Sequence, residues 1–245
     1  MPAPILSLEQ SLHDLVVANR ILAHEGVVDA YGHVSVRHPL HPDRYLLSRS
    51  RSPELVEAHD ILEFMLDGTP VNGAGPTPYV ERFIHGAVYE ARPDIHSVVH
   101  SHALEVMPFT IGDIPMQPVI HVASDIGMNI PLWDIRDHFG DTNLLVSNLA
   151  QGRDLATCLA GNGVVLMRGH GFTAAARTLV EVVKASVYLP SNARVLKEAL
   201  LMGAKVKPLS AGEIAIRATV DPYSPQIQRA WEYWALRAGV KPYLD

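Results

Sequence analysis

Two histidines at alternating positions, and a third in a distant turn, have the spacing in this chain that best suits metal chemistry. Val98-Val99-His100 is a β-branched run expected to end a strand, so His100 and His102 should project to the same side. His170 lies between glycines after another apolar run and can supply a third imidazole. Three such ligands can hold a divalent metal and leave positions open for substrate. The alternative is surface histidines and an unrelated turn, since a short motif is only a hypothesis.

Glu81 is the candidate for proton transfer beside this group. With His85 it stands at i and i+4 on one face of a helix expected over residues 79–91. A carboxylate is favoured near any helix N-terminus, so a solvated charge is one interpretation. The other is a general acid or base that faces the metal, and a proton donor here would need a pKa raised by burial.

Three further polar residues lie within or directly after expected strands. In Gly32-His33-Val34-Ser35-Val36, the alternation places His33 and Ser35 on one strand face and the valines on the other. That polar face could line a pocket or be an ordinary exposed face. His121 follows Val119-Ile120, which we expect to end another strand, and is a candidate pocket residue.

The segment Ser48-Arg49-Ser50-Arg51 gathers two guanidiniums and two hydroxyls before a helix start. Such a group suits capture of a carboxylate or phosphate, and a solvated basic turn is the alternative. The remaining histidines show no partner pattern and are expected to be structural: His13, His24, His38, His41, His59, His96 and His138.

Composition bounds the class of protein. A chain of 245 residues with 48% hydrophobic side chains can bury a sizeable core, so we expect one domain over 1–245, with a helical extension from about residue 222. The net charge of −6 and the absence of a basic block give no reason to expect nucleic acid as a partner. The single Cys158 cannot form an internal disulfide, which fits a reducing compartment. Neither a secretion signal nor a membrane-spanning apolar run is recognisable, so a cytoplasmic protein is expected.

Periodicity and turn residues predict mixed short strands and helices, which favours a single α/β layered domain. We expect strands at 33–36, 45–47, 61–66, 97–100, near 119–120 and at 163–167. We expect helices from residue 8 to near 26, briefly at 52–53, and over 79–91, 103–109 and 151–159. Two more are expected from about 176 to 201, interrupted at Pro190, and from 224 to 238.

Several of these motifs occur together in a known order. The segments 32–37, 92–94 with 99–103, and 168–171, together with Glu81, resemble the class II aldolase/adducin family over roughly residues 8 to 201. The resemblance implies a three-layer α/β/α sandwich with a central, mainly antiparallel sheet. It also implies a homotetramer with active sites at subunit interfaces. The family's metal histidines match His100, His102 and His170, and its catalytic carboxylate matches Glu81. Adducin-like non-enzymes lose metal histidines, whereas all three stand here.

Departures from the family pattern bear on the substrate. Its sugar-phosphate aldolases have Asn where His33 stands, and a Ser-Ser pair where Tyr79-Val80 stand, both for phosphate. Val122 stands where those aldolases have a tyrosine proton donor. The Gly32-His33 pair, Met107-Pro108-Phe109 and the C-terminal segment 229–234 look like another branch. That branch contains metal-dependent decarboxylases of hydroxylated aromatic or pyridine carboxylates.

The resemblance therefore implies a metal-dependent, non-oxidative decarboxylase of a hydroxylated aromatic or heteroaromatic carboxylate. The alternative is a class II aldolase, also a carbon–carbon lyase, acting on a small hydroxy-carbonyl or sugar-phosphate substrate. Release of CO2, against release of an aldehyde or pyruvate, separates the two. Both reactions break a C–C bond and leave electrons that a divalent metal can hold as a Lewis acid. Three histidines suit Zn, Mn, Fe or Co, and the sequence does not distinguish them.

Expected roles follow for the other residues. Glu81 is the first candidate for proton transfer, with His33 and His121 as substitutes. Arg49 or Arg51 would hold a second carboxylate by a bidentate contact, with Ser48 and Tyr79 in the same substrate-binding group. The last helix offers Trp231 and Tyr233, which could cover a substrate ring from a neighbouring subunit or form simple core.

Overall fold

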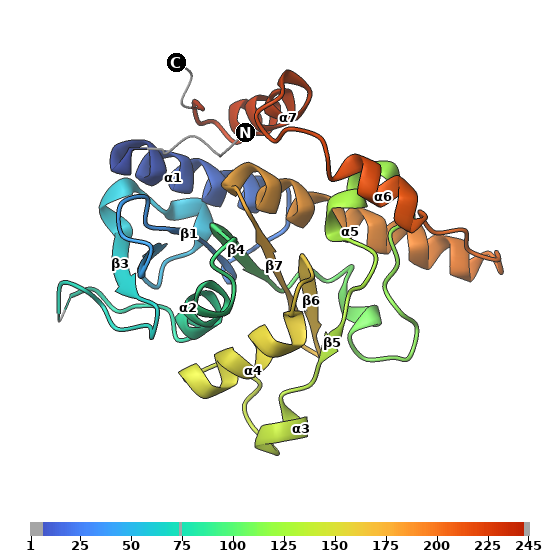
Figure 1. Cartoon of the computed structure of the whole chain (residues 1–245), viewed down its shortest axis with the longest axis horizontal. Helices are drawn as coiled ribbons and strands as arrows, with labels where there is room; N and C mark the ends of the chain where they lie inside the picture. The colour runs from blue at the N-terminus through green and yellow to red at the C-terminus, as the bar shows by residue number, and fades with distance from the viewer. Residues whose placement is uncertain (1–6, 74, 243–245) are drawn as a thin grey trace.

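The strand-forming runs assemble into one seven-stranded sheet in the computed structural model, which describes residues 7–73 and 75–242 (Figure 1). The strand order is β3-β2-β1-β4-β7-β6-β5, and every pair is antiparallel except β5 with β6. This confirms the expected central, mainly antiparallel sheet. The strands are β1 His33–Arg37, β2 Arg44–Ser48, β3 Ile61–Met65, β4 Ser97–Ser101, β5 Leu132–Trp133, β6 Val164–Met167 and β7 Gly171–Ala176.

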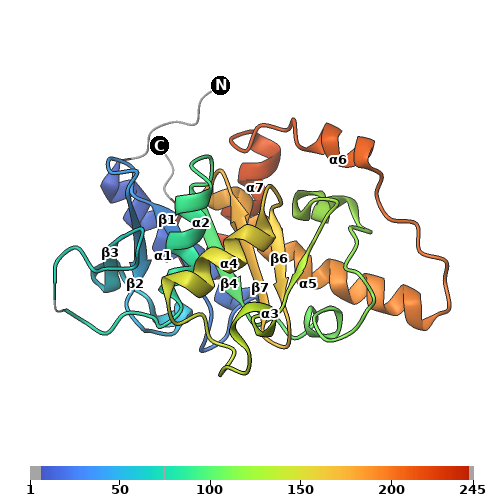
Figure 2. The same cartoon turned by 60° about the horizontal axis from the view of Figure 1, so that its bottom comes forward.

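Helices cover both faces of the sheet, as the predicted three-layer sandwich requires (Figure 2). On one face lie α1 Leu8–His24, α5 Leu179–Leu201 and α7 Pro225–Arg237. On the other lie α2 Arg82–Ala91 and α4 Leu149–Leu159, which pack against each other. Shorter helices are α3 Arg136–Phe139, α6 Ala211–Arg217 and the 3-10 turns Pro53–Leu55, Ala58–Asp60, Met107–Phe109 and His121–Ile126. None of the described helices is long and apolar enough to cross a membrane.

Alternation along the strands divides the apolar side chains between two cores. Val34 and Val99 join the core beneath α1 and α5, whereas Val98 and Val165 join the core beneath α2 and α4. Burying each such side chain contributes about 1.5–3 kcal/mol. Because β1 is buried along its whole length, the polar face of His33 and Ser35 is not an exposed strand face but packs inward.

Two predicted elements are wrong. Val119-Ile120 forms no strand, because Asn192 of α5 binds this segment: its Oδ1 accepts from Val119 N at 2.8 Å and from Ile120 N at 3.4 Å. The helix expected over 103–109 shrinks to Met107–Phe109. Its expected start is diverted, since Ala103 N donates to Ser101 Oγ at 3.1 Å instead of entering a helical turn.

The long helix α5 is continuous through Pro190, contrary to the predicted interruption. A proline in a helix removes one backbone hydrogen bond and costs about 3 kcal/mol. Pro190 is buried in α5, which packs on α1, β4, β7 and α7. Burial of the helix over much of its length outweighs the local cost.

Candidate metal centre

Four ligand-type side chains converge where three separate segments meet. His100 lies in β4 one residue before its end, His102 follows the strand, His170 occupies the β6–β7 turn, and Glu81 immediately precedes α2. Their nearest ligand atoms all lie within 4.8 Å of one another. The structure thus brings together the three predicted histidines and the predicted carboxylate.

The spacing of the ligand atoms fits one divalent ion. The Nε2 atom of His102 lies 3.0 Å from Nε2 of both His100 and His170. Oε2 of Glu81 lies 3.4 Å from Nε2 of His100 and 3.5 Å from Nε2 of His170. Imidazoles bound about 2.0–2.1 Å from one ion place their nitrogens roughly 3.0–3.4 Å apart. These residues therefore have both the chemistry and the separation of a metal site.

The orientation of His100 supports the same conclusion. Its Nδ1 lies 3.0 Å from the backbone carbonyl of Phe172, so Nδ1–H donates there and the Nε2 lone pair faces the cluster. Metal-binding histidines characteristically fix their second nitrogen in this way. His170 Nδ1 is buried with no partner among the described residues.

Glycine makes the close approach of the segments possible. Gly171 has φ +149°, and a Cβ there would collide with the carbonyl oxygen of Ser101. Without a side chain, β7 can begin directly against the end of β4, and His170 comes beside His102. Gly171 is thus a packing requirement of the cluster, whereas Gly169 has open space around it and instead supplies the positive φ of the turn.

Glu81 is not the solvated helix-start charge of the simpler interpretation. It is 7% exposed, precedes α2 and caps it with no side-chain hydrogen bond. Its Oε1 instead accepts from Val146 N at 2.9 Å. Burial would raise the pKa of Glu81, but the imidazoles of His100 and His170 outweigh burial and hold it well below its usual range. The raised pKa that a resting proton donor needs is therefore absent, and Glu81 is a carboxylate able to bind a metal or accept a proton.

A buried hydrogen-bonded chain adjoins the cluster. His33 Nδ1 lies 2.6 Å from His85 Nε2, His85 Nδ1 lies 2.6 Å from Ser35 Oγ, and Ser35 Oγ lies 2.8 Å from the Tyr89 hydroxyl. The ring of His33 also lies 5.2 Å from that of His100. Burial lowers the pKa of His85 to about 3, so this imidazole is neutral at pH 7. The sequence pattern placed His33 and Ser35 on one face but missed their partners on α2.

The predicted anion-binding arginines already share one carboxylate. Asp60, whose side chain is fully buried, binds Arg49 Nε at 2.6 Å and an Arg51 terminal nitrogen at 2.8 Å. Burial would raise the pKa of Asp60, but the Glu57 amide and both guanidiniums lower it to about 2. Two cations facing one anion leave a net positive charge and partly exposed N–H groups for a ligand.

Ser48 and Tyr79 order the backbone of the same segment. Ser48 Oγ donates to the Arg49 carbonyl at 2.9 Å and contacts the Tyr79 hydroxyl at 3.3 Å, and that hydroxyl donates to the Arg51 carbonyl. The Tyr79 ring lies 4.6 Å from the ring of His33. Tyr79 therefore connects the arginines to the histidine cluster.

Replacing Asp60 by asparagine should destabilise the fold by about 2–3 kcal/mol, because two guanidiniums would lose their shared carboxylate. Urea unfolding of the two proteins measures this difference. Asp43→Asn, at an exposed loop position, is the control. An Asp60→Asn protein with the unfolding midpoint of the parent would contradict a structural role for this ion pair.

The other three predicted site residues lie away from the cluster within one chain. His121 is exposed at the start of its 3-10 turn, and none of the described hydrogen bonds or ion pairs joins it to the four ligands. Trp231 is 5% exposed in the core beneath α1 and α5, on the face of the sheet opposite His85. Tyr233 is 57% exposed on α7. A role for any of them would require a neighbouring subunit.

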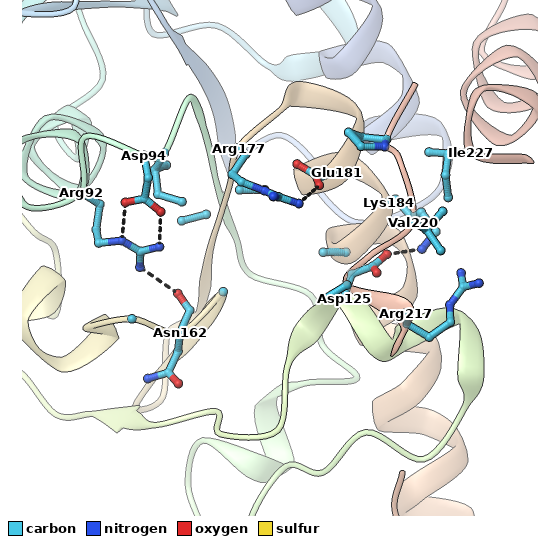
Figure 3. A pocket seen from close by; sticks show the side chains of 18 residues that line it. Arg92, Asp94, Asp125, Asn162, Arg177, Glu181, Lys184, Arg217, Val220 and Ile227 are labelled. Atoms are coloured by element: carbon cyan, nitrogen blue, oxygen red, sulfur yellow. Dashed lines mark hydrogen bonds and ion pairs between the residues drawn. The ribbon is translucent and has the colours of Figure 1, made fainter. Parts of the chain in front are cut away.

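A separate cavity of about 360 Å³ lies at the opposite end of β4 and β7 from the histidines (Figure 3). Its charged side chains pair mainly with one another: Arg92 with Asp94, Arg177 with Glu181 and Lys184 with Asp125. Arg217 also lines it, with a buried Nε that has no partner among the described residues. None of the four metal-ligand candidates lines this cavity, so it is distinct from the proposed site.

A sheet sandwiched between helices, with three histidines and a carboxylate gathered at the end of its central strands, is the arrangement of an enzyme class that could hold a divalent metal. The chain belongs to the class II aldolase and adducin family: the family model described as the Class II Aldolase and Adducin N-terminal domain matches residues 13–196.

Similar proteins narrow the chemistry to carbon–carbon bond cleavage. The chain is 35% identical to decarboxylase tropJ of Talaromyces stipitatus, over 87% of this chain and 88% of that protein. It is 27% identical to a 3,4-dihydroxyphthalate decarboxylase of Arthrobacter keyseri, over 82% of this chain and 83% of that protein. Among solved structures, an L-fuculose 1-phosphate aldolase from Glaciozyma antarctica superposes with a TM-score of 0.74 and 19% identity, covering 100% of this chain and 97% of that one. Since the curated relatives that match three quarters or more of this chain are decarboxylases and aldolases, the chain is a carbon–carbon lyase.

Proposed function

We propose that this lyase is a metal-dependent, non-oxidative decarboxylase of a hydroxylated aromatic or heteroaromatic carboxylate with a second carboxylate group. The observation that carries the proposal is the continuity between the Glu81–histidine cluster and the arginine pair through His33 and Tyr79. One flat substrate could then reach the metal ligands with one end and a guanidinium with the other. The likeness to two decarboxylases, one of them acting on a dihydroxyphthalate, supports the same choice.

The residues of the chain divide the work. His100, His102 and His170 would hold the ion, with Glu81 as a possible fourth ligand, and the bound ion would supply a Lewis acid for the electrons released by C–C cleavage. Because Glu81 rests as a carboxylate, it takes the proton of the ring hydroxyl and returns it to the ring carbon that bears the departing carboxylate. The bond to that carboxylate then breaks, CO2 leaves, and the electron pair restores the aromatic ring.

The arginine pair would hold the second carboxylate of the substrate. A guanidinium presents a planar fork that matches a carboxylate, whereas an ammonium is a point charge. We therefore expect Arg49→Lys or Arg51→Lys to raise KM about tenfold with a smaller change in kcat, because the contact orients substrate without taking part in bond cleavage.

Steady-state kinetics on the best substrate tests this expectation, with Arg153→Lys as the control because Arg153 is exposed and pairs with Glu90 on the surface. If both lysine variants keep the parental KM, the arginine pair does not anchor the substrate.

The decisive assay is CO2 release from a panel of hydroxylated aromatic and pyridine dicarboxylates, including 3,4-dihydroxyphthalate, after loading with zinc, manganese, iron or cobalt. We expect at least one acid to yield CO2. The competing function is aldol cleavage, which aldolases among the relatives support. Cleavage of fuculose phosphate with kcat/KM above ~10⁴ M⁻¹s⁻¹, without CO2 from any acid, would replace the proposal by that alternative.

We also propose that the chain assembles as a homotetramer with sites at the subunit interfaces. Within one chain Leu104, which closely follows His102, is 78% exposed, and Tyr31, whose ring lies 6.4 Å from that of His102, is 69% exposed. Apolar and aromatic surface beside a reaction site favours coverage by another subunit. In a tetramer, His121 or Tyr233 of a neighbour could reach the substrate, whereas Trp231 is buried in the core of its own chain.

A further inference from the structure

The buried chain of hydrogen bonds behind His33 has a direction that its protons dictate. The participating side chains are 0–4% exposed, so solvent does not satisfy them: Tyr89, Ser35, His85 and His33. A buried donor without an acceptor costs about 1–3 kcal/mol, and here four protons share three hydrogen bonds. The one surplus proton costs most at the buried phenol of Tyr89 and least at the other end of the chain, where His33 lies beside His100 at the candidate site.

Tyr89 fixes the direction. Its hydroxyl has Ser35 Oγ as its only hydrogen-bonding side chain among the described residues, at 2.8 Å. If Ser35 donated to Tyr89, the tyrosine proton would have no acceptor. The tyrosine therefore donates to Ser35, and Ser35 donates in turn to His85 Nδ1.

The same reasoning determines which nitrogen carries the proton in His85 and in His33. With Nδ1 of His85 accepting, its proton lies on Nε2 and is donated to His33 Nδ1. The proton of His33 must then lie on Nε2, the nitrogen that the chain leaves unused. A doubly protonated His85 is excluded as well. It would donate to Ser35, Ser35 would then donate to Tyr89, and the tyrosine proton would again have no acceptor.

The geometry points to a new assignment: His85, Ser35 and Tyr89 are positioning residues that hold His33 as an Nε2–H tautomer, a one-way hydrogen-bond donor beside the metal ligands. His33 would then select a substrate oxygen that accepts, such as a carboxylate or phenolate, and disfavour a donor group at that position. This assignment rests on the proposed decarboxylase function for its substrate, but the tautomer itself does not.

The direction of the chain also limits what His33 can do. To release its Nε2 proton, His33 would have to draw protons along the chain from His85, Ser35 and finally Tyr89, leaving a buried phenolate. Burial raises the pKa of Tyr89, which makes that state unfavourable. His33 therefore donates a hydrogen bond, and net proton transfer falls to Glu81.

The tautomer can be read directly. Long-range nitrogen–proton NMR of protein with isotopically labelled histidine, with and without added zinc, distinguishes Nε2–H from Nδ1–H imidazoles. We expect His33 and His85 both to show the Nε2–H pattern. An Nδ1–H pattern at His33 overturns the assignment whatever the enzyme acts on.

Kinetics of two matched serine variants tests the functional part. Ser35→Ala breaks the chain of hydrogen bonds. Ser97→Ala is the control, because it removes an equally buried hydroxyl that is not part of that chain. The Ser97 hydroxyl, on the neighbouring strand, donates instead to the Ser35 carbonyl at 2.8 Å. We expect Ser35→Ala to mix the tautomers of His33 and lower kcat/KM for the aromatic acid about tenfold, with bound metal unchanged. Ser97→Ala should keep both the tautomer and most of kcat/KM.

Tyr89→Phe adds a sharper expectation. The Ser35 proton would still have only His85 as acceptor, so the His33 tautomer should persist. Equal losses of kcat/KM in the Ser35 and Ser97 variants would overturn the functional part. If the wild-type protein decarboxylates none of the acids, the proposed function fails, and the NMR pattern alone decides the positioning assignment.

Discussion

His102→Ala should abolish turnover and leave the purified protein with far less than one metal ion per chain. His102 Nε2 lies 3.0 Å from Nε2 of both His100 and His170, so its removal opens the centre of the ligand group. His100→Ala and His170→Ala should act alike, because the group offers only one carboxylate besides the three imidazoles. Metal analysis of each variant beside its activity provides the measurement.

The control for the histidine variants is His24→Ala, since His24 is exposed at the end of α1. Chelator treatment of the parent should remove activity while circular dichroism stays largely native, because the two cores do not depend on one ion. Stoichiometric metal in any two of the three ligand variants would refute the assignment of the site.

Glu81→Gln should lower kcat by about 10²–10⁴ while the metal is retained at saturating concentration. Glutamine keeps the side-chain length and an oxygen that can accept from Val146 N, but it cannot take or return a proton. Steady-state kinetics with metal analysis of the same sample separates lost proton transfer from lost binding.

Glu90→Gln provides the comparison for Glu81, because Glu90 lies on α2 but is exposed at the surface, where it pairs with Arg153. It should retain parental kcat. Near-normal turnover of Glu81→Gln would move the proton-transfer role to His121, or to His33 against the direction of its hydrogen-bonded chain.

The convergence of His100, His102 and His170 could be predicted because local rules fix their directions. Strand alternation aligns His100 with His102, and the glycines around His170 signal a tight turn. The depressed pKa of Glu81 was not predictable, because it results from two opposing effects. Burial raises the pKa, and the imidazoles of His100 and His170, which are far from Glu81 in the sequence, lower it more. Sequence alone shows neither the competition nor its outcome.

The sequence contains two patterns that relate to the hydrogen-bonded chain behind His33, and the prediction used only the one on the strand. His33 and Ser35 alternate on a strand, and His85 and Tyr89 stand at i and i+4 on α2, so each pair shares a face. Their contact depends on α2 packing over β1, a tertiary arrangement that periodicity does not specify. Likewise, the strand expected at 119–120 does not form, and the amide of Val119 instead donates to Asn192, which is 73 positions away in the sequence.

The contacts that build the metal group join distant parts of the chain: His102 and His170 stand 68 positions apart, and His100 reaches Phe172 across 72. Such pairings form slowly, because a long loop must lose conformational entropy as it closes before any contact can stabilise it. A partly folded chain therefore has no ligand group to offer. Metal would be captured after the rate-limiting step of folding, so it would lengthen the lifetime of the native protein by slowing unfolding and leave the folding rate almost unchanged.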